Sequence, residues 1–212
     1  MMFPIKTALF GILFVVVAGC ASTESSQYYN LTPIPGSDKE SRAESAAQDV
    51  GIGVGPVKIP DYLDRQQIVT SSNQNKIKMA EFDRWAGSLK DDVPRVLSEN
   101  LSNLLSTDRI FLYPWRGDVP IDYQIEVEII RFDGELGRDV LLIARWAIFS
   151  GNNRKVLFIK KSSFTESTGA QGYGAMVAAQ SRVLGRLSRD IAEAVKGLRK
   201  NNLAFLHSEK GG

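Results

Sequence analysis

Few residues of this chain have the type and spacing that chemistry requires. It contains a single cysteine, Cys20, and a single histidine, His207, which excludes a histidine-based catalytic triad and a multi-histidine metal site. No Ser-x-x-Lys or Gly-x-Ser-x-Gly motif marks an activated serine. The chemistry left to consider is that of the lone thiol and of neighbouring carboxylates.

Two pairs of carboxylates lie close together in the sequence, Asp91 with Asp92 and Glu126 with Glu128. Paired carboxylates can act as general acid and general base. The first pair suits a helix N-terminus, where negative charge is favoured, and the second falls on the solvent-facing side of an alternating strand. We interpret both pairs as structural and expect a protein that is not an enzyme.

The glycine-rich segment 51–55 (GIGVG) invites comparison with a nucleotide-binding loop. Such a loop needs glycines that open a helix, because the N-terminal N–H groups of the helix face the phosphates. Here Pro56 and a further strand-like run follow, which is typical of glycines in a strand that another backbone approaches closely. A net charge of +2 gives no strongly basic surface for nucleic acid either.

The lone cysteine ends an apolar run at the start of the chain. Lys6 precedes residues 8–17, which are almost wholly apolar, and small residues follow. A charged region, a short apolar region and a small-residue exit are typical of a secretory signal peptide. The run is shorter than the ~20 residues that span a bilayer, so we expect residues 1–19 to be removed.

The residues around this expected cleavage site, Val17, Ala18, Gly19 and Cys20, resemble the lipobox of bacterial lipoproteins. The resemblance implies cleavage before Cys20, a thioether-linked diacylglycerol group on its sulfur and an N-acyl chain, such as palmitate, on its amino group. Each buried lipid CH₂ contributes roughly 0.8 kcal/mol, so several chains on one residue anchor a protein lastingly in a membrane. No other cofactor and no metal is expected.

The residues that follow Cys20 indicate which membrane holds the anchor. In many bacterial lipoproteins an Asp directly after the lipidated cysteine retains the protein at the inner membrane. Ala21 and Ser22 stand there in this chain, which favours the periplasmic face of the outer membrane. The lipidated cysteine and its tether occupy residues 20–27, and the seven polar or small residues 21–27 reach at most ~25 Å at ~3.5 Å per residue, so we expect the domain to lie close to its bilayer.

Strand and helix periodicities define one domain over residues 28–198. Apolar residues make up 43% and charged residues 24% of the chain, which is typical of a globular fold. The patterns predict strands at 28–32, 51–60, 65–71, 76–82, 109–115, 122–132, 139–149 and 156–164. The strands at 65–71 and 76–82 could form a hairpin around residues 72–75, and the last three strands are expected to form a meander.

Two segments, 88–105 and 173–198, carry apolar residues at helical spacing. Asp91 is the expected N-cap of the first helix, which places Pro94 in its first turn. The element order predicts an α+β fold, in which two long amphipathic helices pack on one face of a mixed or antiparallel β-sheet. Residues 199–212 are expected to form a flexible tail.

Four aromatic residues lie beside Pro, Asp or Arg at the ends of predicted elements, and they are Tyr62, Trp85, Tyr113 and Trp115. They could form a surface that binds a partner, or they could cover the edge of the core. The sequence leaves both interpretations open.

Several segments along the chain match one family pattern. They are Tyr28-Tyr29-x-Leu31, residues 57–65 (VKIPDYLDR), 84–89 (RWAGSL), 99–105 (ENLSNLL), 132–134 (FDG) and 173–176 (YGAM). Together they resemble the PqiC (YmbA) family, the ABC-type transport auxiliary lipoproteins. The resemblance runs from Cys20 to about Leu198, which is nearly all of the chain after the signal peptide.

The resemblance implies a non-enzymatic adaptor that supports the integrity of the cell envelope. Members work with MCE-domain proteins, which form lipid channels across the periplasm, and a homo-oligomer, in the form of a ring, is expected. The alternative is a lipid-anchored envelope hydrolase, which would need a pocket where acid and base groups converge.

Overall fold

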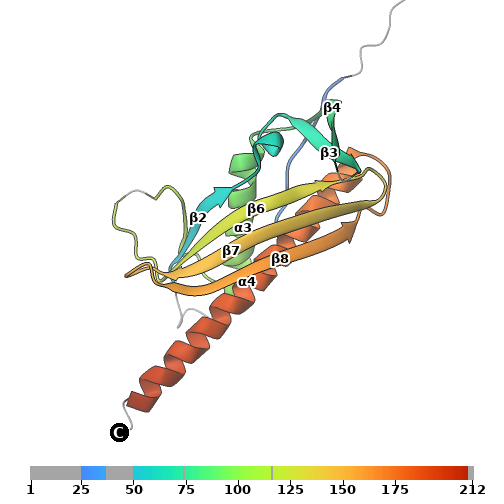
Figure 1. Cartoon of the computed structure of the whole chain (residues 1–212). Helices are drawn as coiled ribbons and strands as arrows, with labels where there is room; N and C mark the ends of the chain where they lie inside the picture. The colour runs from blue at the N-terminus through green and yellow to red at the C-terminus, as the bar shows by residue number, and fades with distance from the viewer. Residues whose placement is uncertain (1–24, 37–49, 74, 116, 210–212) are drawn as a thin grey trace, which may run out of the picture.

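A computed structural model describes residues 25–36, 50–73, 75–115 and 117–209 of the chain (Figure 1). Two β-sheets and two long α-helices make up this part, which confirms the α+β class. The signal peptide, the lipobox-like residues with Cys20 and most of the tether lie outside the described residues. Their assignments therefore stay predictions.

The larger sheet contains five strands, which are β2 (Ile52–Lys58), β5 (Ile110–Leu112), β6 (Tyr123–Gly134), β7 (Asp139–Ser150) and β8 (Val156–Ser167). Their order is β5-β2-β6-β7-β8. β6, β7 and β8 form the predicted antiparallel meander, whereas β2 runs parallel to both β5 and β6. The sheet is therefore mixed.

A smaller, three-stranded sheet covers one end of the larger sheet, at the top of Figure 1. It contains β1 (Gln27–Tyr29), β3 (Gln67–Asn73) and β4 (Lys76–Trp85) in the order β1-β4-β3. β3 and β4 form the predicted hairpin, and β1 joins β4 in parallel. A short 3₁₀-helix, η3 (Asp61–Leu63), precedes β3. The sequence patterns predicted the hairpin but not that it would leave the main sheet.

The first long helix, α3 (Leu89–Leu105), begins at Ser88, whose Oγ accepts a hydrogen bond from the Lys90 amide at 3.2 Å. The predicted N-cap, Asp91, is wrong, because Ser88 already occupies that position. Asp91 lies in the first turn instead, where its charge faces the positive end of the helix dipole. Pro94 consequently lies in the second turn, where it removes one helical hydrogen bond.

The second long helix, α4 (Tyr173–Glu209), continues past Leu198, where we expected it to end. No proline or glycine follows Leu198 before Gly211, so nothing in the sequence stops the helix there. Figure 1 shows its C-terminal part projecting beyond both sheets. Within the described residues, neither helix has an apolar stretch long enough for a membrane span.

The hydrophobic core lies between the two helices and one face of the larger sheet, as predicted (Figure 1). Alternate side chains of β7 point toward the helices and are buried, and these are Val140, Leu142, Ala144, Trp146 and Ile148. The facing helix stripes are also buried, with Val93, Val96, Leu97 and Leu101 from α3 and Val183, Leu184, Leu187 and Ile191 from α4.

The glycines of segment 51–55 lie where other backbone comes close, which confirms the interpretation given to them. A Cβ atom on Gly51 would lie 1.9 Å from the Pro120 carbonyl oxygen, and the φ angle of Gly55 is +125°, which L side chains rarely adopt. The segment leads into β2 and not into a helix, so it presents no helix N-terminus to a phosphate.

Candidate functional site

The segment that follows β1, residues 30–36, lies along both long helices, and we call it the strap. Three side chains of the helices accept hydrogen bonds from strap amides, which are Asp92 from Leu31 at 2.8 Å, Asn100 from Ile34 at 2.8 Å and Ser181 from Thr32 at 3.1 Å. The strap is therefore held by α3 and α4 together.

Asn100 is the central residue of this attachment. Its side chain is fully buried, and its Nδ2 donates a hydrogen bond to Ser188 Oγ at 3.0 Å while its Oδ1 accepts from Ile34. One amide thus joins the strap, α3 and α4. A buried amide with both ends bonded is stable, whereas a buried amide left without partners is costly.

Arg95 of α3 also binds the strap, through a carbonyl oxygen. Its Nη2 donates to the Leu31 carbonyl oxygen at 3.1 Å and also to Asp92, while its Nη1 donates to Glu99 Oε1 at 2.7 Å. Asp92 consequently bonds both an amide of the strap and a guanidinium. This carboxylate holds the chain in place, which agrees with the structural interpretation of the Asp91 and Asp92 pair.

β1 adds a second attachment just before the strap. The Tyr29 hydroxyl donates to Asp83 Oδ1 at 2.8 Å, and the Ala86 amide donates to the Tyr29 carbonyl oxygen at 2.8 Å. The hydrogen bond to Asp83 is the main cause that raises the pKa of Tyr29. Gln27, which the sequence analysis assigned to the tether, lies in β1.

The four aromatic candidates do not form one surface. Trp85 is 5% exposed and belongs to the core, which favours the second of the two interpretations for this residue. Tyr62 is half-buried, and its hydroxyl donates to Asp133 Oδ2 at 2.8 Å. Tyr113, 51% exposed, and Trp115 form an edge-to-face pair with ring centroids 5.2 Å apart. Of the four candidates, only Tyr113 and Trp115 form an aromatic pair at the surface.

Asp133 forms a buried polar cluster that the sequence did not reveal. It is 3% exposed, and its Oδ1 accepts from Arg131 Nε at 2.9 Å, while Arg131 Nη2 donates to Ser71 Oγ at 3.3 Å. The pKa of Tyr62 is raised mainly by burial and, to a smaller extent, by the hydrogen bond to Asp133. Tyr62 thus stays protonated at neutral pH and acts as a donor. The cluster links η3 and the hairpin to β6.

The second carboxylate pair is also engaged by arginines. Glu126 Oε1 lies 2.7 Å from Arg154 Nη2, and Glu128 Oε2 lies 2.9 Å from Arg145 Nη1. These ion pairs agree with the structural role that we assigned to Glu126 and Glu128 from the strand pattern. In the part of the chain that the structure describes, no three His, Cys, Asp or Glu side chains group as a metal site.

The described domain is thus an α+β unit whose strap is tied to its own two long helices. The chain belongs to the family of ABC-type transport auxiliary lipoprotein components, whose model matches residues 29–192. This confirms the resemblance seen in the sequence. The family consists of transport-associated envelope lipoproteins, which are non-enzymatic in kind.

Individual relatives agree with this membership. The chain is similar to the intermembrane transport lipoprotein PqiC of Escherichia coli (strain K12), with 26% identity over 194 residues that cover 91% of this chain and 99% of the relative. The protein of the same name from Shigella flexneri matches equally well.

Two solved structures show the same fold. A Xanthomonas campestris protein superposes with a TM-score of 0.66 at 10% identity, covering 83% of this chain and 99% of its own. An uncharacterized protein superposes with a TM-score of 0.65 at 19% identity, covering 81% and 99%. At these identities the likeness concerns the fold alone.

Proposed function

We propose that this protein is a non-enzymatic adaptor of an MCE-type lipid-transport system, held at the periplasmic face of the outer membrane and needed for envelope integrity. The observation that carries the proposal is the family match over residues 29–192, which covers nearly the whole described domain. The relatives named intermembrane transport lipoproteins, matched over 99% of their length, support the transport role.

The anchor of this adaptor is Cys20, with its diacylglycerol group and N-acyl chain. A free tether of residues 20–26 would reach at most ~25 Å at ~3.5 Å per residue, because β1 begins at Gln27. The hydrogen bonds of β1 and the strap then fix the domain firmly to that tether. The remaining surface is available to an MCE-domain protein and to further copies of this chain, arranged as a ring.

The aromatic pair of Tyr113, which is exposed, and Trp115, which is partly buried, is our candidate for contact with the MCE-domain partner. Aromatic side chains give large contact areas at low entropic cost and are enriched where protein surfaces bind. Tyr62 is less suitable, because its hydroxyl is already hydrogen-bonded to Asp133. Trp85 is less suitable, because its ring is buried.

Loss of the anchor tests the proposal in cells. A strain that lacks the protein should be sensitive to detergents and should be rescued by the wild-type chain. We expect Cys20→Ala, exported through an ordinary cleavable signal, to be folded in the periplasm and to rescue poorly, because one missing thioether removes the lipid attachment. Full rescue by the unanchored protein would contradict the role of the anchor.

A further inference from the structure

An arginine-rich groove lies between α4, β8 and the strap. Its volume is about 500 Å³, and Pro33, Ile34, Pro35 and Ala178 form an apolar part of its wall. Three arginines of α4 line it, namely Arg182, Arg186 and Arg189. Their spacing of four and three residues puts them on one face of the helix. This groove is separate from the aromatic pair proposed to contact a partner.

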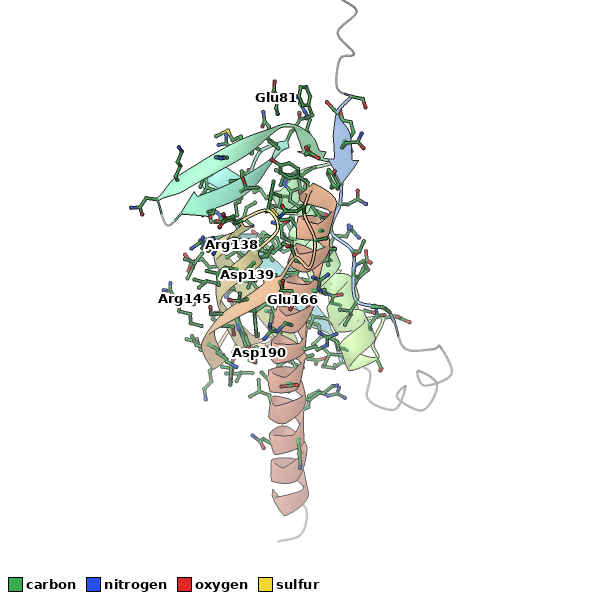
Figure 2. All side chains as sticks on the ribbon, turned by 90° about the vertical axis from the view of Figure 1, so that its right-hand side faces the viewer. Glu81, Arg138, Asp139, Arg145, Glu166 and Asp190 are labelled. Atoms are coloured by element: carbon green, nitrogen blue, oxygen red, sulfur yellow. The ribbon has the colours of Figure 1, made fainter. Side chains whose placement is uncertain are left out.

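The groove carries more positive than negative charge. Among the described residues that line it, Glu166 is the only carboxylate, and Figure 2 shows Glu166 next to α4. Its Oε1 accepts from Arg182 Nε at 2.8 Å, and its Oε2 lies 3.7 Å from Arg186 Nη1. One carboxylate is thus shared by two arginines. With the third arginine, the lining has an excess of two positive charges.

Arg182 and Arg186 are held in place by further contacts with β8. Arg182 Nη2 donates to the Ser167 carbonyl oxygen at 2.7 Å, and Arg186 Nη1 donates to the Thr165 carbonyl oxygen at 2.8 Å. The Arg186 guanidinium also lies 4.9 Å from the centre of the Phe164 ring. Each guanidinium has five N–H donors, so both arginines keep donors that these bonds do not use.

Arg189, the third arginine, takes no part in the hydrogen bonds and ion pairs that hold Arg182 and Arg186. Among the described residues, its guanidinium has no hydrogen-bond or ion-pair partner. A Cβ atom on Gly185 would lie 3.9 Å from Arg189 Nη1 and 2.6 Å from Ile34 Cγ2. The guanidinium thus lies over Gly185 and lines the groove. The missing side chain of Gly185 makes room for Ile34, whereas Arg189 would be in ordinary contact with a Cβ atom there.

We propose that this groove binds the phosphate head group of an anionic lipid. Guanidinium groups present paired N–H donors that match phosphate oxygens, and the apolar wall formed by the strap and Ala178 would cover the adjoining carbons. A volume of about 500 Å³ falls within the usual range of small-ligand sites. The groove is built by this chain alone, so the inference does not depend on the MCE partner.

The test uses the full mature protein, lipidated and purified in a non-ionic detergent. Native mass spectrometry would follow its titration with dihexanoylphosphatidylglycerol, which is anionic and dissolves without forming bilayers. We expect one lipid per chain and about tenfold weaker binding for Arg189→Gln, as the loss of one charged hydrogen bond implies. Arg189→Lys should retain part of the affinity, because it keeps the charge.

Matched controls decide between this proposal and its competitors. Arg145→Gln removes an arginine that pairs with Glu128 and lies apart from α4 in Figure 2, so its lipid binding should equal that of the wild type. Equal binding of dihexanoylphosphatidylcholine would overturn the selection for anionic lipid. Inorganic phosphate binding as tightly as the lipid would overturn the lipid assignment. No one-to-one complex, or no effect of Arg189→Gln, would overturn the site itself.

Discussion

Asp133 is the residue on which the junction between the two sheets depends. It is a buried carboxylate with donors from two elements, the Tyr62 hydroxyl of η3 and the Arg131 guanidinium of β6. A buried charge persists only where donors satisfy it, and removal of one donor leaves the remainder poorly compensated. We therefore expect the loss of a single donor atom in this cluster to lower the stability of the domain.

The hydroxyl of Tyr62 offers a direct test of that junction. We expect Tyr62→Phe to lower the free energy of unfolding by about 1–2 kcal/mol, because Asp133 then lacks one buried donor. Urea unfolding of the purified protein measures the change. Tyr28→Phe is the control, since Tyr28 is 64% exposed and its change should be close to zero. Equal effects of the two variants would show that the hydroxyl contributes nothing specific.

The same tyrosine makes stability depend on pH in the alkaline range. Burial and the bond to Asp133 raise the pKa of Tyr62, so the folded protein holds this proton more tightly than the unfolded chain does. Its contribution is complete below the ordinary tyrosine pKa of about 10 and is lost as pH rises above that value. We expect the urea midpoint of the wild type to fall more steeply above about pH 10 than that of Tyr62→Phe. Parallel curves for the two proteins would contradict this account.

At the scale of elements, the sequence predicts best what depends on local periodicity. Both helices and the meander of β6, β7 and β8 follow their apolar patterns, because each can be recognised from neighbours along the chain. The parallel pairing of β1 with β4, and of β2 with β5 and β6, joins segments that lie far apart in the sequence. Such pairings leave no local signal, so the second sheet was not predicted.

The attachment of the strap escaped prediction for the same reason. The Leu31 amide bonds to a side chain 61 residues away, and the Thr32 amide bonds to one 149 residues away. The three arginines of the groove did leave a signal, since their spacing marks one face of a predicted helix. Only the tertiary structure shows that this face meets the strap.

Asn100 allows the strap to be tested as an element. We expect Asn100→Ala to destabilise the domain by about 2 kcal/mol and to loosen the strap, because the Ile34 amide and Ser188 both lose a buried partner. Chymotrypsin should then cut faster after Leu31, and mass spectrometry of the fragments would record it. Asn201→Ala, an exposed change on α4, is the control. Unchanged cleavage after Leu31 would contradict the proposed attachment.

At the scale of the whole molecule, the two ends of the described domain differ in how they are held. The strap and β1 secure the N-terminal end, and α4 projects from the body at the opposite end in Figure 1. A domain of this form suits a component that is held at one membrane and binds a partner, which is the role we propose. The groove that we propose for an anionic lipid would give the protein a ligand as well. That inference does not depend on the adaptor role.

The most direct test of the adaptor role is what the protein binds in its own envelope. We would extract the tagged, full-length protein with mild detergent after crosslinking and identify the co-purifying proteins by mass spectrometry. We expect to recover an MCE-domain protein in near-stoichiometric amount, and less of it when Tyr113 and Trp115 are replaced by alanine. Clean recovery of the anchored protein without any MCE-domain protein, repeated with and without crosslinking, would contradict the adaptor role.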